Sequence, residues 1–216
     1  MSTCLPIPAS TEAIPLAPMA DVLDALPAGR PVLVLDDAAR ENEADLVCAA
    51  DRLSEPVMAM MIREGSGIVC LCITPEHAAA LQLRPMVEVN RSRFGTAFTQ
   101  SIEAAQGVST GVSAANRVQT IRCALRSAAG GREIVSPGHV FPLVARPGGT
   151  LERDGHTEAA VDLPALAGLA PAGVLCELMN ADGSMATGAQ VARFARAHGL
   201  LCTTVAAVAA WRLRPV

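Results

Sequence analysis

Residues 36–45 concentrate the charged groups that could do chemistry in this chain. The segment contains five carboxylates and one guanidinium, that of Arg40, and it follows a short apolar run typical of a buried strand. Carboxylates at this density repel one another unless they share a cation. The segment therefore has two interpretations: a solvated acidic loop, or a loop that binds a divalent cation together with a phosphorylated substrate.

Residues 148–159 form a second segment suited to ligand binding. Its glycines open the backbone, Arg153 offers a planar set of donors, and His156 and Thr157 stand at the start of a predicted helix. The backbone N–H groups and the dipole of a helix N-terminus both favour an anion. The segment therefore predicts a phosphate site, although a capping arrangement with Thr157 as the N-cap fits the same residues.

Two single residues are unusual in their surroundings. His139 lies in a Gly- and Pro-rich turn, where functional residues concentrate, although a lone His is more often structural. Glu177 is a carboxylate within an apolar predicted strand, and alternation places it on the same face as Leu175 and Met179. Because a buried carboxylate without a partner is costly, we expect Glu177 to lie at a solvated strand end or to contact a ligand.

The small-residue loop at residues 107–113 contains Thr110 and precedes a predicted helix. It could contact a phosphate or substrate hydroxyls, or it could simply cap that helix. The sequence contains no Gly-x-Ser-x-Gly nucleophile elbow, no P-loop and no dinucleotide-binding glycine pattern after its first strand. These enzyme classes therefore have little support.

The composition of the 216 residues excludes further classes. A hydrophobic content of 51% predicts a substantial core, and a net charge of −4 with 2% aromatic residues argues against nucleic-acid binding. The seven Cys stand mostly in apolar runs, as expected of buried thiols in a reducing cytoplasm. The first twenty residues contain no Lys or Arg, so we expect no targeting signal. The longest apolar stretches fall short of the ~20 residues of a membrane span, so we expect no membrane insertion.

The alternation of strand-like and helix-like segments predicts the fold class. We expect an α/β fold of the α+β type, with helices flanking a mixed sheet, residues 1–17 as a loose N-terminal arm and residues 18–216 as a single compact domain. Ser54 and Thr74 are predicted to cap helices, and residues 127–138 are predicted to be rich in turns. Strands or strand-like apolar stretches are predicted at residues 31–35, 46–50, 67–73, 96–103, 139–145, 173–179 and 201–205. Helices are predicted at residues 19–26, 54–63, 74 onward, 113–125, 157–169, 191–198 and around Trp211.

Six motifs in the same order resemble those of the 3,4-dihydroxy-2-butanone 4-phosphate synthases, lyases of riboflavin biosynthesis. The motifs lie at residues 36–46, 65–70, 110–114, 137–143, 155–159 and 171–177, and the resemblance runs from about Val22 to Trp211. It implies a compact α/β domain that works as a homodimer, with active sites near the subunit interface. It also implies the conversion of D-ribulose 5-phosphate to L-3,4-dihydroxy-2-butanone 4-phosphate and formate, with two Mg²⁺ (or Mn²⁺) ions per site.

The resemblance further implies roles for individual residues. Glu41 and His156 would hold the metal ions, and Asp36 and Glu43 would be supporting acids of the same loop. The residues implied to bind substrate are Arg40, Glu41, Asp45, Thr110, Arg153, Asp154, Gly155, His156, Thr157 and Glu177. The residues implied to take part in catalysis are Glu43, Asp45, His139 and Glu177.

The sequence departs from the family pattern at three positions. Ala44 replaces a glycine, which would cost about 1 kcal/mol and stiffen the acidic loop if that position needs a positive φ. Asn116 replaces an aspartate, and Thr187 replaces an arginine. Two alternatives stay open: a relative that acts on another sugar phosphate, and an inactive binding subunit. We expect a single activity, because the chain has no room for the GTP cyclohydrolase II domain to which this family is sometimes fused.

Overall fold

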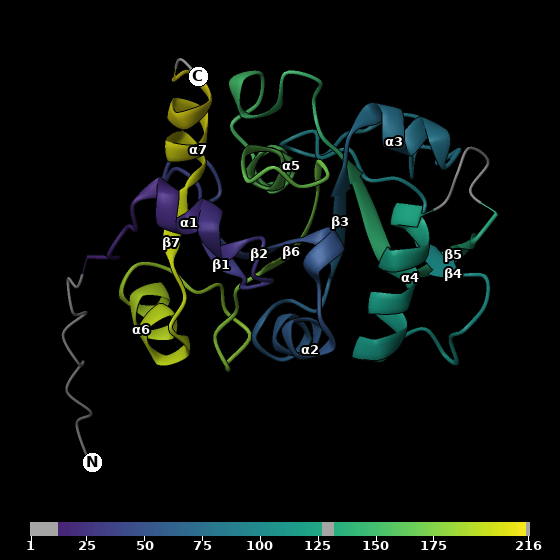
Figure 1. Cartoon of the computed structure of the whole chain (residues 1–216), viewed down its shortest axis with the longest axis horizontal. Helices are drawn as coiled ribbons and strands as arrows, with labels where there is room; N and C mark the ends of the chain where they lie inside the picture. Colours follow the sequence, from purple (N-terminus) through teal and green to yellow (C-terminus); the bar gives the residue numbers. More distant parts are fainter. Residues whose placement is uncertain (1–12, 127–131, 215–216) are drawn as a thin grey trace, which may run out of the picture.

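The computed structural model describes residues 13–126 and 132–214 (Figure 1). The strands are β1 (Val32–Leu35), β2 (Ala44–Ala49), β3 (Cys70–Ile73), β4 (Ile102–Ala104), β5 (Ile134–Val144), β6 (Ala172–Glu177) and β7 (Cys202–Thr204). Within the described residues they form one seven-stranded sheet in the order β4-β5-β3-β6-β2-β1-β7. β1 runs parallel to β7 and β3 runs parallel to β5, whereas the other neighbouring pairs are antiparallel.

Helices cover both faces of this sheet (Figure 1). They are α1 (Met19–Ala25), α2 (Glu55–Glu64), α3 (Pro75–Ala80), α4 (Ala114–Arg126), α5 (His156–Leu166), α6 (Ala189–His198) and α7 (Val205–Arg212). α1, α5 and α7 pack on one face, and α2, α4 and α6 pack on the other. α3 lies beside α4, where the His77 ring is 3.0 Å from the Ala124 carbonyl oxygen. The predicted mixed α/β fold is confirmed.

The central strands are apolar on both sides because each side faces helices. In β2, Leu46 and Cys48 belong to the core on the side of α2, α4 and α6, whereas Val47 and Ala49 belong to the core on the side of α5. Burial on two faces explains why such strands appear as continuous apolar runs in the sequence. The same alternation places Asp45 on the α5 side of the sheet.

The helix starts predicted at Ser54 and Thr74 are confirmed. The Ser54 hydroxyl accepts a hydrogen bond from the Val57 N–H over 3.5 Å, and the Thr74 hydroxyl accepts one from the His77 N–H over 3.2 Å. Both helices also have a proline in the first turn, where its missing N–H costs nothing. Local chemistry therefore fixes where α2 and α3 begin.

Two predictions near the β4 edge of the sheet were wrong in extent. The strand predicted at residues 96–103 is reduced to β4, a β-bulge interrupts the pairing of β4 with β5, and Phe98 forms only an isolated bridge with Leu143. The turn-rich segment predicted at residues 127–138 instead contains the start of β5 from Ile134 onward. This part of β5 extends beyond its pairing with β3, so it tolerates the Pro and Gly that a central strand would exclude. Residues 127–131 lie outside the described residues.

The expected N-terminal arm is described only at its end, because residues 1–12 lie outside the described residues. Leu16 forms a parallel bridge with Cys202, and the Ala17 N–H donates to the Cys202 carbonyl oxygen over 2.8 Å. Residues 16 and 17 are therefore fixed to β7 rather than loose.

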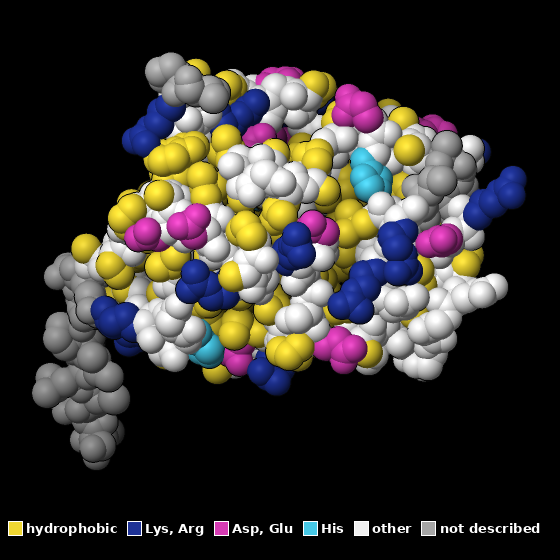
Figure 2. Space-filling model, in the orientation of Figure 1, with side chains coloured by type: hydrophobic (Ala, Val, Ile, Leu, Met, Phe, Trp, Pro, Cys, Tyr) yellow, Lys and Arg dark blue, Asp and Glu magenta, His cyan; other side chains and the backbone are white. Residues whose placement is uncertain are grey.

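The surface carries a mixture of charged and hydrophobic side chains. Charged side chains of both signs are scattered among hydrophobic ones over the face shown in Figure 2. Within residues 13–126 and 132–214, no helix has the length and apolar character needed to cross a bilayer.

Burial raises the pKa of the Cys176 and Cys202 thiols to about 11, so both stay protonated near neutral pH and pack as small apolar side chains.

Candidate active site

Two carboxylates on neighbouring strands form the floor of the candidate site. Asp45 of β2 and Glu177 of β6 are direct partners in the antiparallel register, so their side chains point to the same side of the sheet. That side faces α5, since Leu175 belongs to the same core as that helix. His156 is the first residue of α5 and lies against Asp45. Three segments that are distant in the sequence therefore meet at the N-terminus of α5.

A cavity of about 110 Å³ opens between these segments. Eight of the predicted site residues line it: Arg40, Glu41, Glu43, Asp45, Arg153, His156, Thr157 and Glu177. The rest of its wall comes from Thr96, Phe98, Leu143 and Leu175. These four were not predicted, because nothing in the sequence distinguishes an apolar or small wall residue from an ordinary core residue.

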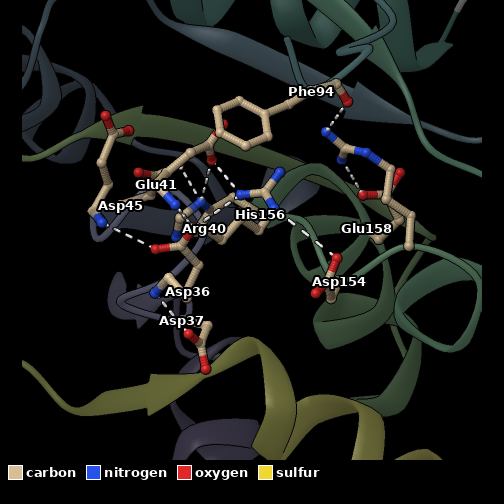
Figure 3. A network of polar contacts seen from close by, with 12 residues as sticks. Asp36, Asp37, Arg40, Glu41, Asp45, Phe94, Asp154, His156 and Glu158 are labelled. Atoms are coloured by element: carbon tan, nitrogen blue, oxygen red, sulfur yellow. Dashed lines mark hydrogen bonds and ion pairs between the residues drawn. The ribbon is translucent and has the colours of Figure 1, made fainter.

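Asp36 organises the acidic loop. Its side chain is fully buried, and its Oδ1 accepts a hydrogen bond from the Glu43 N–H over 3.0 Å. Its Oδ2 accepts from the Glu41 N–H over 3.0 Å and from Arg40 Nη1 over 2.9 Å, and Arg40 also pairs with the Glu41 carboxylate (Figure 3). Asp36 thus holds the loop in one shape, and its oxygens are already occupied.

Glu41, Asp45 and His156 all line the cavity, and their side chains lie close to one another (Figure 3). His156 Nδ1 lies 3.7 Å from Glu41 Oε2 and 3.8 Å from Asp45 Oδ2. Two buried atoms of this cluster, Asp45 Oδ1 and His156 Nε2, have no hydrogen-bond partner in the described part of the protein. Since buried polar atoms are nearly always paired, these two atoms indicate a site that can bind a ligand.

The pKa values of the cluster also indicate a site that can bind a cation. Burial lowers the pKa of His156, but the attraction of Asp45 and Glu41 outweighs it and raises that pKa to about 9. Burial raises the pKa of Asp45 to about 7 despite the nearby His156. Contact with His156, followed by Arg40, lowers the pKa of Glu41, whereas burial raises that of Glu43. Near neutral pH the cluster therefore holds protons that a divalent cation would displace on binding.

The donor set fits a hard divalent cation. Ligand atoms of Asp36, Glu41 and His156 lie within 4.8 Å of one another. Because Asp36 already accepts from three donors, Glu41 and His156 are the better ligands of the three. Carboxylate oxygens with one imidazole suit Mg²⁺ or Mn²⁺, which complete their coordination with water and substrate oxygens.

Arg153 is held by two acceptors beside the cavity. Its Nη1 donates to Glu158 Oε2 over 2.5 Å, and its Nη2 donates to the Phe94 carbonyl oxygen over 3.2 Å (Figure 3). Glu158 is buried, and its other oxygen accepts from the Arg146 N–H over 3.0 Å. Arg40 stacks on the Phe94 ring, 5.1 Å from the ring centroid. Phe94 therefore contacts both arginines of the cavity and helps to fix their orientation.

The start of α5 differs from the capping arrangement considered for the sequence. Gly155 is the N-cap, and Thr157 lies within the first turn, so the N-cap assignment of Thr157 was wrong. A Cβ at residue 155 would lie 2.1 Å from Arg153 Nη1, so only glycine allows Arg153 to pass so close to the backbone. Asp154 does not line the cavity. Its exposed carboxylate lies 4.0 Å from Arg40 Nε.

Ser66 is a neighbour of Glu177 that the sequence prediction missed. Its hydroxyl donates to Glu177 Oε2 over 2.5 Å, and its N–H donates to the Glu177 carbonyl oxygen over 2.9 Å. Gly65 makes this approach possible, since a Cβ there would lie 2.7 Å from Cys176 Sγ. The turn at residues 65–67 was a motif of the family resemblance, but the motif alone does not say which side chain Ser66 contacts.

His139 and Thr110 do not join the cavity. His139 lies on β5, where its Nδ1 is 2.6 Å from Glu103 Oε2 and its side chain is 47% exposed. Thr110 lies in an exposed loop that Asn116 holds by accepting hydrogen bonds from the Ser109 and Gly111 N–H groups over 3.2 and 3.1 Å. A Cβ at Gly111 would lie 2.6 Å from His139 Nδ1, so this loop and His139 are neighbours. One chain therefore presents two separate groups of predicted site residues.

The structure explains the departures at Ala44 and Asn116, whereas nothing in it explains Thr187. Ala44 lies in β2 and is fully buried, and the positive φ of the acidic loop falls on Asn42 at 56°, so the strain considered for Ala44 does not arise. Asn116 keeps the acceptor oxygen that an aspartate would supply to the loop at residues 107–113. Thr187 lies outside the cavity, where its N–H donates to Gln190 Oε1 over 3.0 Å.

Carboxylates, a histidine and two arginines around one cavity of a mixed α/β sheet define an enzyme site for acid–base chemistry. The family model described as 3,4-dihydroxy-2-butanone 4-phosphate synthase matches residues 20–211. The chain therefore belongs to the 3,4-dihydroxy-2-butanone 4-phosphate synthase family, as its motifs predicted.

Relatives and solved structures agree with this assignment. The chain is 64% identical to a 3,4-dihydroxy-2-butanone 4-phosphate synthase of Ralstonia nicotianae, with 91% of this chain and 86% of the relative covered. It matches a solved 3,4-dihydroxy-2-butanone 4-phosphate synthase in complex with two magnesium ions with a TM-score of 0.87 at 39% identity, covering 91% of this chain and 97% of that one. It also matches a two-domain synthase from A. baumannii with a TM-score of 0.86 at 41% identity, covering 91% of this chain but 58% of that one.

Proposed function

We propose that this chain converts D-ribulose 5-phosphate to L-3,4-dihydroxy-2-butanone 4-phosphate and formate, with Mg²⁺ or Mn²⁺, as a step of riboflavin biosynthesis. The observation that carries the proposal is the convergence of Glu41, Asp45, His156 and Glu177 on one cavity beside Arg153. Family membership selects this reaction among the acid–base reactions that such a cavity could support. Enolisation, dehydration and rearrangement of a sugar phosphate all need groups that take up and return protons.

The phosphate is proposed to bind at the N-terminus of α5. Arg153 and Thr157 line the cavity there, and the helix dipole and free N–H groups of the first turn favour an anion. Arg153 is already oriented by Glu158 and the Phe94 carbonyl, so it need not be ordered on binding. Arg40, which is oriented by Asp36, is proposed to hold the substrate from the side of the acidic loop.

Glu41 and His156 are proposed to hold two divalent ions together with substrate oxygens. When bound, such an ion polarises the carbonyl and hydroxyl oxygens of a sugar and so makes the neighbouring C–H more acidic. The unpaired buried nitrogen of His156 and the unpaired oxygen of Asp45 support this assignment. The relative that was solved with two magnesium ions supports the proposed number of two ions.

The remaining acids are proposed to move protons. Asp45 and Glu177 lie on the same face at paired positions, so a substrate above them is within reach of both. Glu43 lines the cavity beside them. Phe98, Leu143 and Leu175 form an apolar wall that limits water around reactive intermediates.

A homodimer is proposed to complete the site. His139 and Thr110 lie outside the cavity of their own chain, so a second copy of the chain is proposed to bring them to it. The exposed apolar side chains Ile68, Val112 and Val135, each close to half exposed, support a contact surface on this side of the molecule. The buried thiols of the core are consistent with a proposed location in the cytoplasm, where thiols stay reduced.

The decisive experiment is a ¹³C NMR assay of the purified protein with labelled D-ribulose 5-phosphate and Mg²⁺. We expect signals of formate and of the four-carbon phosphate, which disappear with EDTA and in the Glu41→Gln variant. Parallel assays with other pentulose and tetrulose phosphates test the alternative of a related substrate. A folded protein that consumes another sugar phosphate but leaves ribulose 5-phosphate unchanged would refute the proposed function.

A further inference from the structure

His139 and Glu103 form a close pair at the β4 edge of the sheet, away from the cavity. His139 Nδ1 is 2.6 Å from Glu103 Oε2, a distance typical of a strong hydrogen bond to a carboxylate. The Glu103 side chain is 12% exposed, whereas that of His139 is 47% exposed. The carboxylate is therefore mostly buried, whereas about half of the ring that it contacts is exposed.

The second oxygen of Glu103 is also engaged. The Thr120 hydroxyl donates to Glu103 Oε1 over 2.9 Å, and the same hydroxyl accepts from the Ala104 N–H over 3.0 Å. Thr120 is fully buried in α4, so it cannot move far from this position. The carboxylate is held at both oxygens and presents Oε2 to His139 in a fixed direction.

Gly111 leaves room for the hydrogen bond between His139 and Glu103 because it has no side chain. Gly111 has a φ of +81°, and a Cβ at this position would lie 1.8 Å from Glu103 Oε2 and 2.6 Å from His139 Nδ1. Any other residue at position 111 would therefore collide with the hydrogen-bonded atoms. The loop that carries Thr110 is thus packed against the pair, and Asn116 holds that loop from the other side.

We propose that Glu103 is a positioning residue for His139 and sets the tautomer of its ring. A carboxylate can only accept, so Nδ1 carries the proton and the neutral ring keeps a free electron pair on Nε2. The role of Glu103 in turnover rests on the proposed function, in which His139 serves the cavity of a second copy of the chain.

The test compares Glu103→Gln with the wild type and with Glu133→Gln, which removes an exposed carboxylate from the same end of the sheet. The Thr120 hydroxyl donates to the Oε1 position, so the glutamine is expected to place its carbonyl oxygen there and its amide N–H towards Nδ1. That donor would favour the opposite tautomer, with its proton on Nε2. Long-range ¹H–¹⁵N NMR of the imidazoles distinguishes the two tautomers. The chain has only four His, and the His139→Asn variant assigns the relevant signal.

We expect the Nδ1–H tautomer in the wild type and in Glu133→Gln, and the Nε2–H tautomer or a mixture in Glu103→Gln. We also expect kcat to fall by on the order of 100-fold in Glu103→Gln while KM changes by less than about threefold, since proton transfer and not binding is impaired. Circular dichroism and the oligomeric state should match the wild type. An Nε2–H tautomer in the wild type, or an unchanged tautomer in Glu103→Gln, would overturn the proposal.

The tautomer measurement needs no substrate, so it separates this inference from the proposed function. A wild type that leaves ribulose 5-phosphate unchanged while showing the Nδ1–H tautomer refutes the function but supports the positioning of His139 by Glu103. A wild type that turns over normally while Glu103→Gln keeps full kcat refutes the role of Glu103 in catalysis.

Discussion

Asp45 and Glu177 face each other across β2 and β6, two carboxylates at directly paired positions of an antiparallel ladder. Like charges in such positions destabilise a sheet by a few tenths of a kcal/mol or more. His156 lies 3.8 Å from Asp45 and offsets part of this repulsion. The site is thus built around an excess of negative charge, which makes its behaviour depend on protons and cations.

Binding of Mg²⁺ or Mn²⁺ should release a proton. Asp45 and Glu41 raise the pKa of His156 to about 9 in the metal-free protein, so the ring must lose a proton before it can act as a ligand. We therefore expect the apparent affinity to rise by up to about tenfold per pH unit between pH 6.5 and 9. Titration calorimetry in two buffers of different ionisation enthalpy measures the released proton. Binding heats that do not depend on the buffer would contradict this prediction.

The stability of the metal-free protein should fall as the pH rises. The pKa of His156 is raised above its ordinary value of 6.5, so the folded state binds this proton more tightly than the unfolded state does. The resulting stabilisation is complete below about pH 6.5 and is lost as the pH rises through about 9. The raised pKa of Asp45 acts in the same direction between about pH 4 and 7.

Urea unfolding in EDTA at pH 6.5 and pH 9 measures this effect. A shift from 6.5 to about 9 corresponds to at most about 3 kcal/mol in the free energy of unfolding. The His156→Asn variant is the control, and its free energy of unfolding should change much less over the same interval. An equal change in the wild type and in this variant would assign the pH dependence to other groups.

Ser66→Ala should lower kcat with little effect on KM. The Ser66 hydroxyl donates to Glu177 Oε2, and its loss frees the carboxylate to rotate away from the substrate, whereas the backbone bond from Ser66 to Glu177 is kept. We expect a fall of about tenfold in kcat. Ser92→Ala, in an exposed turn, serves as the control in the same steady-state assay. A kcat equal to that of the control would show that Glu177 is oriented without Ser66.

Arg153→Lys should raise KM for the sugar phosphate. A lysine cannot bond both Glu158 and the Phe94 carbonyl while offering a planar pair of donors to a phosphate. We expect KM to rise by about 10- to 100-fold, which corresponds to about 1.4–2.7 kcal/mol of lost binding. Arg146→Lys is a matched control, because Arg146 contacts Glu158 only through its backbone N–H. A similar KM in the two variants would place the phosphate elsewhere.

Mixing two inactive variants should restore activity if the site is shared between chains. His139→Asn and His156→Asn each disable a different half of the proposed composite site. Random exchange of subunits makes half of the dimers mixed, and each mixed dimer has one intact site, so about one quarter of the wild-type activity should return. The assay follows turnover after the variants are mixed, unfolded and refolded together. No recovery despite mixed dimers would show that each chain completes its own site.

The predictable part of the fold depends on local chemistry. The central strands could be located because burial on both faces leaves uninterrupted apolar runs, and α2 and α3 could be located because Ser54 and Thr74 cap them. The start of β5 could not be located, because Pro137 and Gly138 are ordinary turn residues and only the position beyond β3 permits them in a strand.

The candidate site was predictable in its composition but not in its arrangement. Charged residues in apolar surroundings marked Asp45 and Glu177, yet their pairing follows from the register of β2 and β6, which no local pattern shows. The bond from Ser66 to Glu177 joins residues 111 positions apart. The separation of His139 from the cavity is likewise a property of the whole sheet, because a neighbouring motif in the sequence need not be a neighbour in space.

The way in which Asp36 holds the acidic loop has a consequence for kinetics. Glu41 stands on a loop that is already closed by three hydrogen bonds to one buried carboxylate, before any ion arrives. Little conformational entropy then remains to be lost on capture of the ion. The rate of metal uptake would thus be set by how fast the ion sheds its own water, and Mn²⁺, which exchanges water faster than Mg²⁺, would load the protein sooner.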